Sequence, residues 1–177
     1  MASINNKTLL IIACILALIG WIVALAGVAR TTDLCNKHEK DNQWRGWGGY
    51  DCDKAWRYDW WGIWFTFFLT IVLIIMAWFD KVGGWVSTLQ AFCAACLSVT
   101  MIDTHNWIGI SESWNGDSED AANAALAGFI IICIALFLII IFLGMGGAGV
   151  NVNVSISKSS KTSPEKESKP TKSVDNA

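Results

Sequence analysis

Four long apolar blocks without a charged residue most constrain how this chain can fold. They cover residues 8–29, 61–79, 85–102 and 124–143. The first block contains 22 residues. As an α-helix it would extend roughly 33 Å, which is enough to cross a bilayer. The blocks therefore predict an all-α integral membrane protein, built as a four-transmembrane-helix bundle.

The segments between the blocks divide the chain further. Residues 1–145 would form the four-helix membrane domain, with outer loops over 30–60 and 103–121 and a tight hairpin at "DKVGG". Residues 146–177 are rich in Ser and Lys, and we expect a disordered cytosolic tail. A competing interpretation takes residues 1–26 as a cleaved signal peptide, because the first apolar run ends in Ala-Leu-Ala.

Charge placement predicts the orientation. The second outer loop carries acids and no Lys or Arg, whereas the tail carries five lysines. Basic residues favour the cytosolic side, so both termini are expected in the cytosol. The protein would then be a multi-pass protein of the plasma membrane or of a secretory-pathway membrane.

Cys35 and Cys52 are the two cysteines outside the apolar blocks, and both lie in the first outer loop. In an oxidising compartment they predict a disulfide that closes a loop of about 18 residues and contributes roughly 3 kcal/mol. The alternative is a pair of unrelated free thiols.

Small residues indicate where the helices pack, because membrane helices associate through close backbone contact. Gln90 is the strongly polar side chain farthest inside a block, and we interpret it as an interhelical hydrogen bonder. The polar third helix should be the most buried or should face a partner. The expected packing residues besides Gln90 are Ala13, Ala17, Gly20, Ala24, Gly27, Ala94, Ser98 and Gly128.

The first outer loop is rich in aromatic residues. Trp44, Trp47, Tyr50 and Trp56 lie outside the apolar blocks. They would form a recognition surface, or they would pack onto the helix ends.

Cys93 and Cys96 form a Cys-x-x-Cys motif inside the third block. With Cys35 and Cys52 they fit the cysteine count of a four-helix membrane thiol oxidoreductase. Their expected depth near the bilayer midplane argues against that enzyme, because the loop cysteines could not easily reach them. No catalytic, cofactor-binding or metal-binding residues are therefore assigned, and no basic patch predicts a nucleic-acid partner.

A channel or transporter is also disfavoured by the sequence. Such proteins need charged or broken spans. The four blocks contain neither an internal charge nor a proline.

Two tetraspan families share features with this chain. "LALIGWIVALAG" resembles the first helix of claudin-type proteins, with Cys35 and Cys52 in the position of their loop disulfide. The short second loop, the stretch "EDAANAALAGF" and the tails resemble MARVEL-type proteins more closely. The Casparian-strip branch of that group has a basic residue in helix one and an acid in helix three. Here Arg30 and Asp103 would fall only at helix ends.

The MARVEL-type resemblance implies scaffolding, membrane apposition or vesicle traffic. The sequence thus predicts a non-enzymatic organiser of membrane domains, embedded in the lipid bilayer, that assembles with copies of itself or with other membrane proteins. The thiol oxidoreductase and an accessory subunit of a larger membrane complex remain the alternatives.

Overall fold

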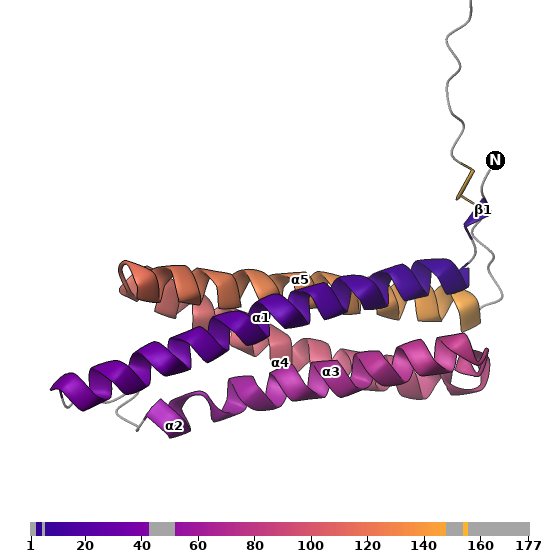
Figure 1. The fold of residues 1–177 in the computed structure, drawn as a ribbon. Helices are drawn as coiled ribbons and strands as arrows, with labels where there is room; N and C mark the ends of the chain where they lie inside the picture. Colours follow the sequence, from indigo (N-terminus) through magenta and orange to yellow (C-terminus); the bar gives the residue numbers. More distant parts are fainter. Residues whose placement is uncertain (1–2, 5, 43–51, 148–153, 156–177) are drawn as a thin grey trace, which may run out of the picture.

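The computed structural model describes residues 3–4, 6–42, 52–147 and 154–155. Four long helices dominate this part of the chain, and each is apolar enough to cross a membrane. A single turn, α2 (Cys52–Ala55), precedes the second long helix, and the 3-10 helix η2 (Val82–Trp85) precedes the third (Figure 1). The long helices are α1 (Asn6–Asn42), α3 (Arg57–Trp78), α4 (Val86–Ser113) and α5 (Asp117–Gly147). The prediction of an all-helical, multi-pass membrane bundle is confirmed.

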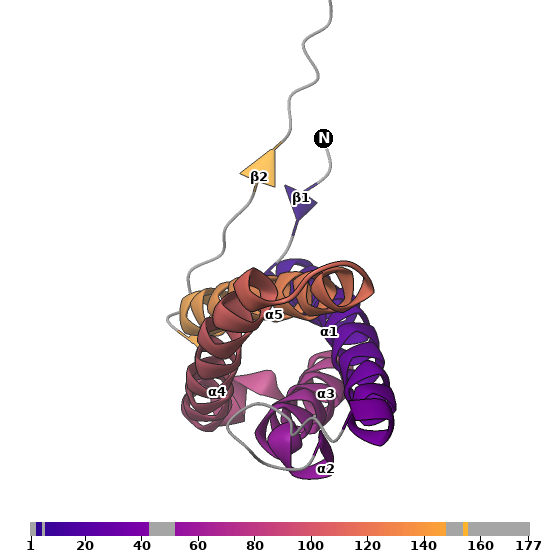
Figure 2. The ribbon, with the colours of Figure 1, turned by 90° about the vertical axis from the view of Figure 1, so that its left-hand side faces the viewer.

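The four helices form a ring around a common axis. Figure 2 looks along that axis, and α1 and α4 each lie between α3 and α5. Apolar side chains from the four helices fill the core, among them Ala17, Leu73, Leu89 and Leu136. Because each helix buries one stripe against the core, the opposite stripes face outward as large exposed hydrophobics, as a bilayer-facing surface requires.

Two short strands pair at one end of the bundle. β1 (Ser3–Ile4) pairs antiparallel with β2 (Val154–Ser155), which follows α5 (Figure 1). We call this end the terminal end, and the opposite end, which carries α2, the disulfide end. The predicted disordered tail, residues 146–177, lies mostly outside the described residues; within it, 146–147 end α5 and 154–155 form β2.

The helices extend well beyond the apolar blocks. Residues 30–42 continue α1, and residues 103–113 continue α4, so much of both predicted outer loops is helical. Hydropathy reports which residues prefer lipid, not where backbone hydrogen bonding stops. In the extension of α1, Asp33 pairs with Arg30 at 3.2 Å and with Lys37 at 2.8 Å, at spacings that support a helix.

The seam between α1 and α5 is the closest helix contact in the bundle. A Cβ atom at Gly128 would collide with the backbone of Ala24, and one at Gly27 would collide with the backbone of Ala125. These glycines therefore allow the two backbones to approach directly, as in small-residue packing of membrane helices.

The α3–α4 pair makes the sparsest contact of the four neighbouring pairs in the ring. An apolar groove of about 540 Å³ opens between them. Phe68 of α3 and Phe92 of α4 line opposite sides of this groove, and both are exposed.

Candidate functional site

Two carboxyl groups lie buried in the bundle near the disulfide end. Asp59 is in the first turn of α3, and Asp103 is well inside α4. Their exposed fractions are 6% and 0%. The inference that the spans hold no internal charge is therefore wrong, because α4 continues through Asp103 for another ten residues to Ser113.

The two carboxyl groups differ in their partners. Asp59 Oδ1 accepts a hydrogen bond of 2.8 Å from Trp107 Nε1. Neither oxygen of Asp103 has a hydrogen-bond partner. Buried polar groups are nearly always paired, so a buried carboxyl group with both oxygens unpaired needs an explanation.

Gly62 makes room for the Asp103 carboxyl group. A Cβ atom at Gly62 would lie 2.5 Å from Asp103 Oδ2 and 3.2 Å from a methyl of Val99. Asp59 is three residues before Gly62 on α3, and Trp107 is four residues after Asp103 on α4. Both spacings place side chains on one helix face. The two acids therefore share one α3–α4 interface, about one helical turn apart.

A run of hydroxyl and thiol groups continues inward from the acids. Thr66 Oγ1 lies 3.3 Å from Cys96 Sγ. Cys133 of α5 donates to Thr100 Oγ1 at 3.4 Å, and its sulfur lies 3.7 Å from Thr104 Oγ1. These groups connect α3, α4 and α5 through the interior.

The threonine hydroxyl protons are already used within their own helices. Thr66 donates to Gly62 O at 2.9 Å, Thr100 to Cys96 O at 3.1 Å, and Thr104 to Thr100 O at 2.7 Å. A hydroxyl has one proton to donate, so these oxygens are left as acceptors. The threonine oxygens therefore accept, and the thiols of Cys96 and Cys133 are the donors to them.

Tryptophans close the bundle at the disulfide end. Trp56 stacks on Trp107 with ring centroids 5.1 Å apart and meets Trp114 edge-on at 6.2 Å. We call these three residues the tryptophan lid. Cys35 and Cys52 form a disulfide, as predicted, and Cys52 opens the helical turn that leads to Trp56. The disulfide thereby ties the lid to α1.

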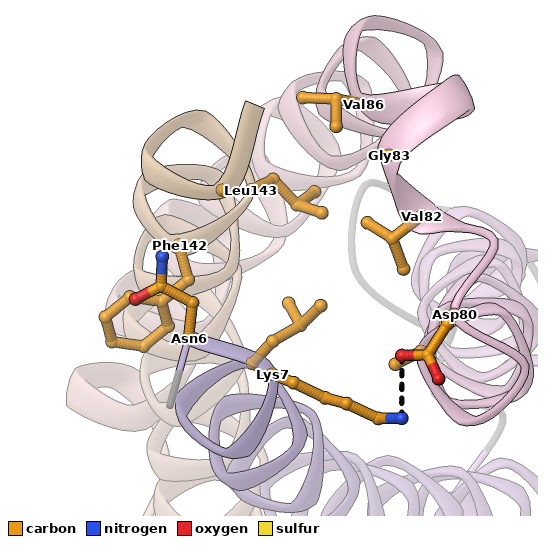
Figure 3. A pocket seen from close by; sticks show the side chains of 11 residues that line it. Asn6, Lys7, Asp80, Val82, Gly83, Val86, Phe142 and Leu143 are labelled. Carbon is orange, nitrogen blue, oxygen red and sulfur yellow. Dashed lines mark hydrogen bonds and ion pairs between the residues drawn. The ribbon is translucent and has the colours of Figure 1, made fainter. Parts of the chain in front are cut away.

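A cavity opens at the terminal end. Its volume is about 180 Å³, and residues from α1, α3, α4 and α5 line it (Figure 3). Leu10 and Leu143 form part of its apolar wall. Across its mouth, Lys7 Nζ of α1 lies 2.8 Å from the carboxylate of Asp80, just beyond α3.

The predicted packing residues of α1 and α5 are buried at the seam. These buried residues are Ala13, Ala17, Gly20, Ala24, Gly27 and Gly128.

Gln90 links another pair of helices in the bundle, α4 and α5. Its side chain donates a hydrogen bond of 3.2 Å to Ile140 O of α5.

Ala94 and Ser98 need a correction. Both are exposed, on the outer face of α4, and they do not pack against another helix of this chain. α4 is also the least buried of the four long helices, not the most buried. Small residues suit close packing, but their spacing does not say whether the partner belongs to the same chain.

Of the predicted aromatic residues of the first outer loop, the structure describes Trp56. Trp44, Trp47 and Tyr50 lie outside the described residues, and Trp56 is buried in the tryptophan lid rather than exposed for recognition. Cys93 and Cys96 are free, buried thiols of α4. Neither Asp59 nor Asp103 is among the predicted site residues, although the Asp103–Trp107 spacing places an acid and a tryptophan N–H on one helix face.

No protein-family model matches the chain. No curated protein sequence matches it. Among solved structures, the bundle is similar to the crystal structure of the Chlamydomonas reinhardtii LCI1 channel, with a TM-score of 0.64 and 19% sequence identity. The match covers 78% of this chain and 95% of the channel chain. The likeness establishes a shared four-helix membrane fold.

Proposed function

We propose that this protein is a channel-type conduit that passes small cations or neutral polar solutes through the interior of its four-helix bundle. The observation that carries the proposal is the buried, unpartnered carboxyl group of Asp103. Ionisable groups are expensive inside membrane bundles, so they occur mostly where they serve a pathway.

Other features support a pathway along the bundle axis. All four long helices contribute residues to the cavity at the terminal end, and hydroxyl and thiol groups lie between α3, α4 and α5 toward the acids. Buried leucines between them, such as Leu73 and Leu89, would form a hydrophobic constriction that gates by excluding water. The shared fold with a protein described as a channel agrees with this proposal.

The charges favour cations over anions. Among the buried residues of the described part, the charged side chains are Asp59 and Asp103, and none is Lys, Arg or His. Rings or pairs of acids select for cations in channels. We therefore expect the conduit to exclude chloride.

Flux into liposomes tests this function. The purified protein should raise potassium or proton flux by about tenfold or more over empty liposomes, while chloride entry stays at background. Asp117→Asn is the matched control for Asp103→Asn, because Asp117 lies at the same end but its side chain is 85% exposed. No flux of any cation or neutral solute, or equal flux in Asp103→Asn, would contradict the proposal.

The second candidate is the organiser of membrane domains that the MARVEL-type resemblance implies. The exposed face of α4, with Ala94 and Ser98, favours it, because close-packing residues on a lipid-facing surface suit a partner helix. In that case Ala94→Leu with Ser98→Leu should dissociate an assembly in mild detergent. A lone monomer from the unmodified protein would count against the organiser and against the accessory subunit.

A further inference from the structure

We propose that Asp103 is a proton-binding site and that the proton is the cation that crosses the bundle. This inference rests on the proposed conduit and names the species that it carries. It follows from the count of hydrogen-bond donors around the Asp103 carboxyl group.

No hydrogen-bond donor lies within reach of either oxygen of Asp103. The hydroxyl protons of Thr66, Thr100 and Thr104 are bound to backbone carbonyl groups of their own helices. Trp107, one turn further along α4, donates its N–H to Asp59 instead. An ionised carboxylate is an acceptor only, whereas a protonated one has its own O–H to donate. With no donor within reach, a buried carboxylate costs more free energy than the neutral acid, so the surroundings favour the protonated form.

The groups that face Asp103 supply no positive charge. From α3 these are Asp59 and the partly exposed Tyr58, and Cys96 lies on α4 itself. Cys133 of α5 contacts the adjacent Thr100 and Thr104. On α1, the described basic side chains toward this end include Arg30 and Lys37, which are exposed and both pair with Asp33. Arg57, at the start of α3, is also exposed.

A metal ion fits this site less well than a proton. The described residues contain no group of three or more His, Cys, Asp or Glu placed to hold a metal. The Asp103 carboxyl group also packs directly on the backbone of Gly62, which leaves little room for a multi-ligand shell on that side. A proton needs one oxygen and no added volume.

The transfer requires no other reactant. A hydronium ion on one side gives a proton to an Asp103 oxygen, an O–H bond forms, and the donor leaves as water. The O–H bond then breaks toward a water molecule on the other side, and its electron pair returns to the carboxylate. One positive charge crosses in each cycle. Asp59, one turn nearer to the disulfide end, is the next carboxyl group along this route.

Infrared spectroscopy tests proton binding without any transport assay. The protein in liposomes should show the C=O stretch of a protonated carboxylic acid, shifted in heavy water and lost in Asp103→Asn. Asp117→Asn should keep the band. If Asp103→Asn fails to fold, Asp103→Glu serves instead and should move the band rather than remove it. A spectrum that neither variant changes would overturn the binding site.

Proton flux tests the cargo. Liposomes with an entrapped pH dye and a potassium diffusion potential should acidify, and Asp103→Asn should slow this by about tenfold or more, with Asp117→Asn unchanged. If the carboxylic-acid band is present and potassium crosses but protons do not, the conduit stands and this inference fails. If no solute crosses although the band is present, the proposed function and the proton cargo fail together, and only the binding site survives.

Discussion

Trp107 Nε1 donates a hydrogen bond of 2.8 Å to Asp59 Oδ1, and this bond joins α4 to α3 in the interior of the bundle. Both residues are buried, and Trp107 has an exposed fraction of 0%. The bond satisfies one of the two buried acids and fixes the indole ring on which Trp56 stacks. The same contact therefore positions an acid and anchors the tryptophan lid.

Trp107→Phe should destabilise the bundle, because it keeps most of the ring volume but leaves a buried carboxyl oxygen without its donor. We expect a loss of about 1–3 kcal/mol in the free energy of unfolding. Thermal or denaturant unfolding in detergent micelles measures it. Trp64→Phe is the control, since Trp64 is exposed on α3 and should tolerate the change. Equal losses in the two variants would show that the Asp59 bond contributes nothing.

Gly128→Ala should destabilise the α1–α5 seam, because the added methyl group would overlap the backbone of Ala24. Overpacking of this kind costs about 1–3 kcal/mol. Gly109→Ala is a matched change in α4, where a Cβ atom would meet nothing within 4 Å. We expect that variant to be neutral or more stable, since alanine favours a helix over glycine by about 1 kcal/mol. Melting temperatures that change in the same direction would argue against the close seam.

Reduction of the Cys35–Cys52 bond should loosen the tryptophan lid. The two residues are 17 positions apart in sequence, and closure of a loop of this size contributes about 3 kcal/mol. The melting temperature should fall and tryptophan fluorescence should shift to longer wavelength upon reduction. A Cys35→Ser, Cys52→Ser variant should behave like the reduced protein and show no further response to reductant.

Thiol labelling in intact cells should reveal the orientation. With the disulfide end outside and both termini in the cytosol, a membrane-impermeant maleimide should label Cys35 and Cys52 only after mild reduction. Cys93 and Cys96 are buried in the bundle and should stay unlabelled. Labelling of Cys93 or Cys96, or a mixed disulfide between them and the loop pair, would support the thiol oxidoreductase function instead.

Lys7→Ala should leave stability nearly unchanged, because the ion pair with Asp80 is exposed, with side-chain exposures of 40% and 75%. Such pairs contribute about 0–1 kcal/mol. Removal of a positive charge from the mouth of the terminal cavity should nevertheless raise cation flux at low salt, and the gain should fade as salt screens the site. A salt-independent flux would place the cation path elsewhere.

The transmembrane helices and the disulfide could be predicted because their signals are local. Uncharged length identifies a span, and two loop cysteines in an oxidising compartment identify a bond. The close approach of α1 and α5 at Gly27 and Gly128 also follows a pattern that small residues make visible.

The orientation of α4 could not be predicted in the same way. In a membrane helix both faces are apolar, so hydropathy does not separate the core from the lipid side. Ala94 and Ser98 therefore looked like core residues although they face outward. The position of Asp103 within its helix could not be predicted either. Its charge ends the apolar block, which predicts a helix end, whereas α4 continues to Ser113.

The unequal packing of the ring has a mechanical consequence. α1 and α5 touch backbone to backbone, whereas α3 and α4 leave an apolar groove between them. We therefore expect α1 and α5 to stay together and α3 to be the helix that shifts most easily. A small outward movement of α3 would separate Gly62 from the Asp103 carboxyl group and admit water to the acid. Cys52 of the disulfide lies seven residues before Asp59 along the chain, so the bond to Cys35 would limit how far α3 can move away from α1.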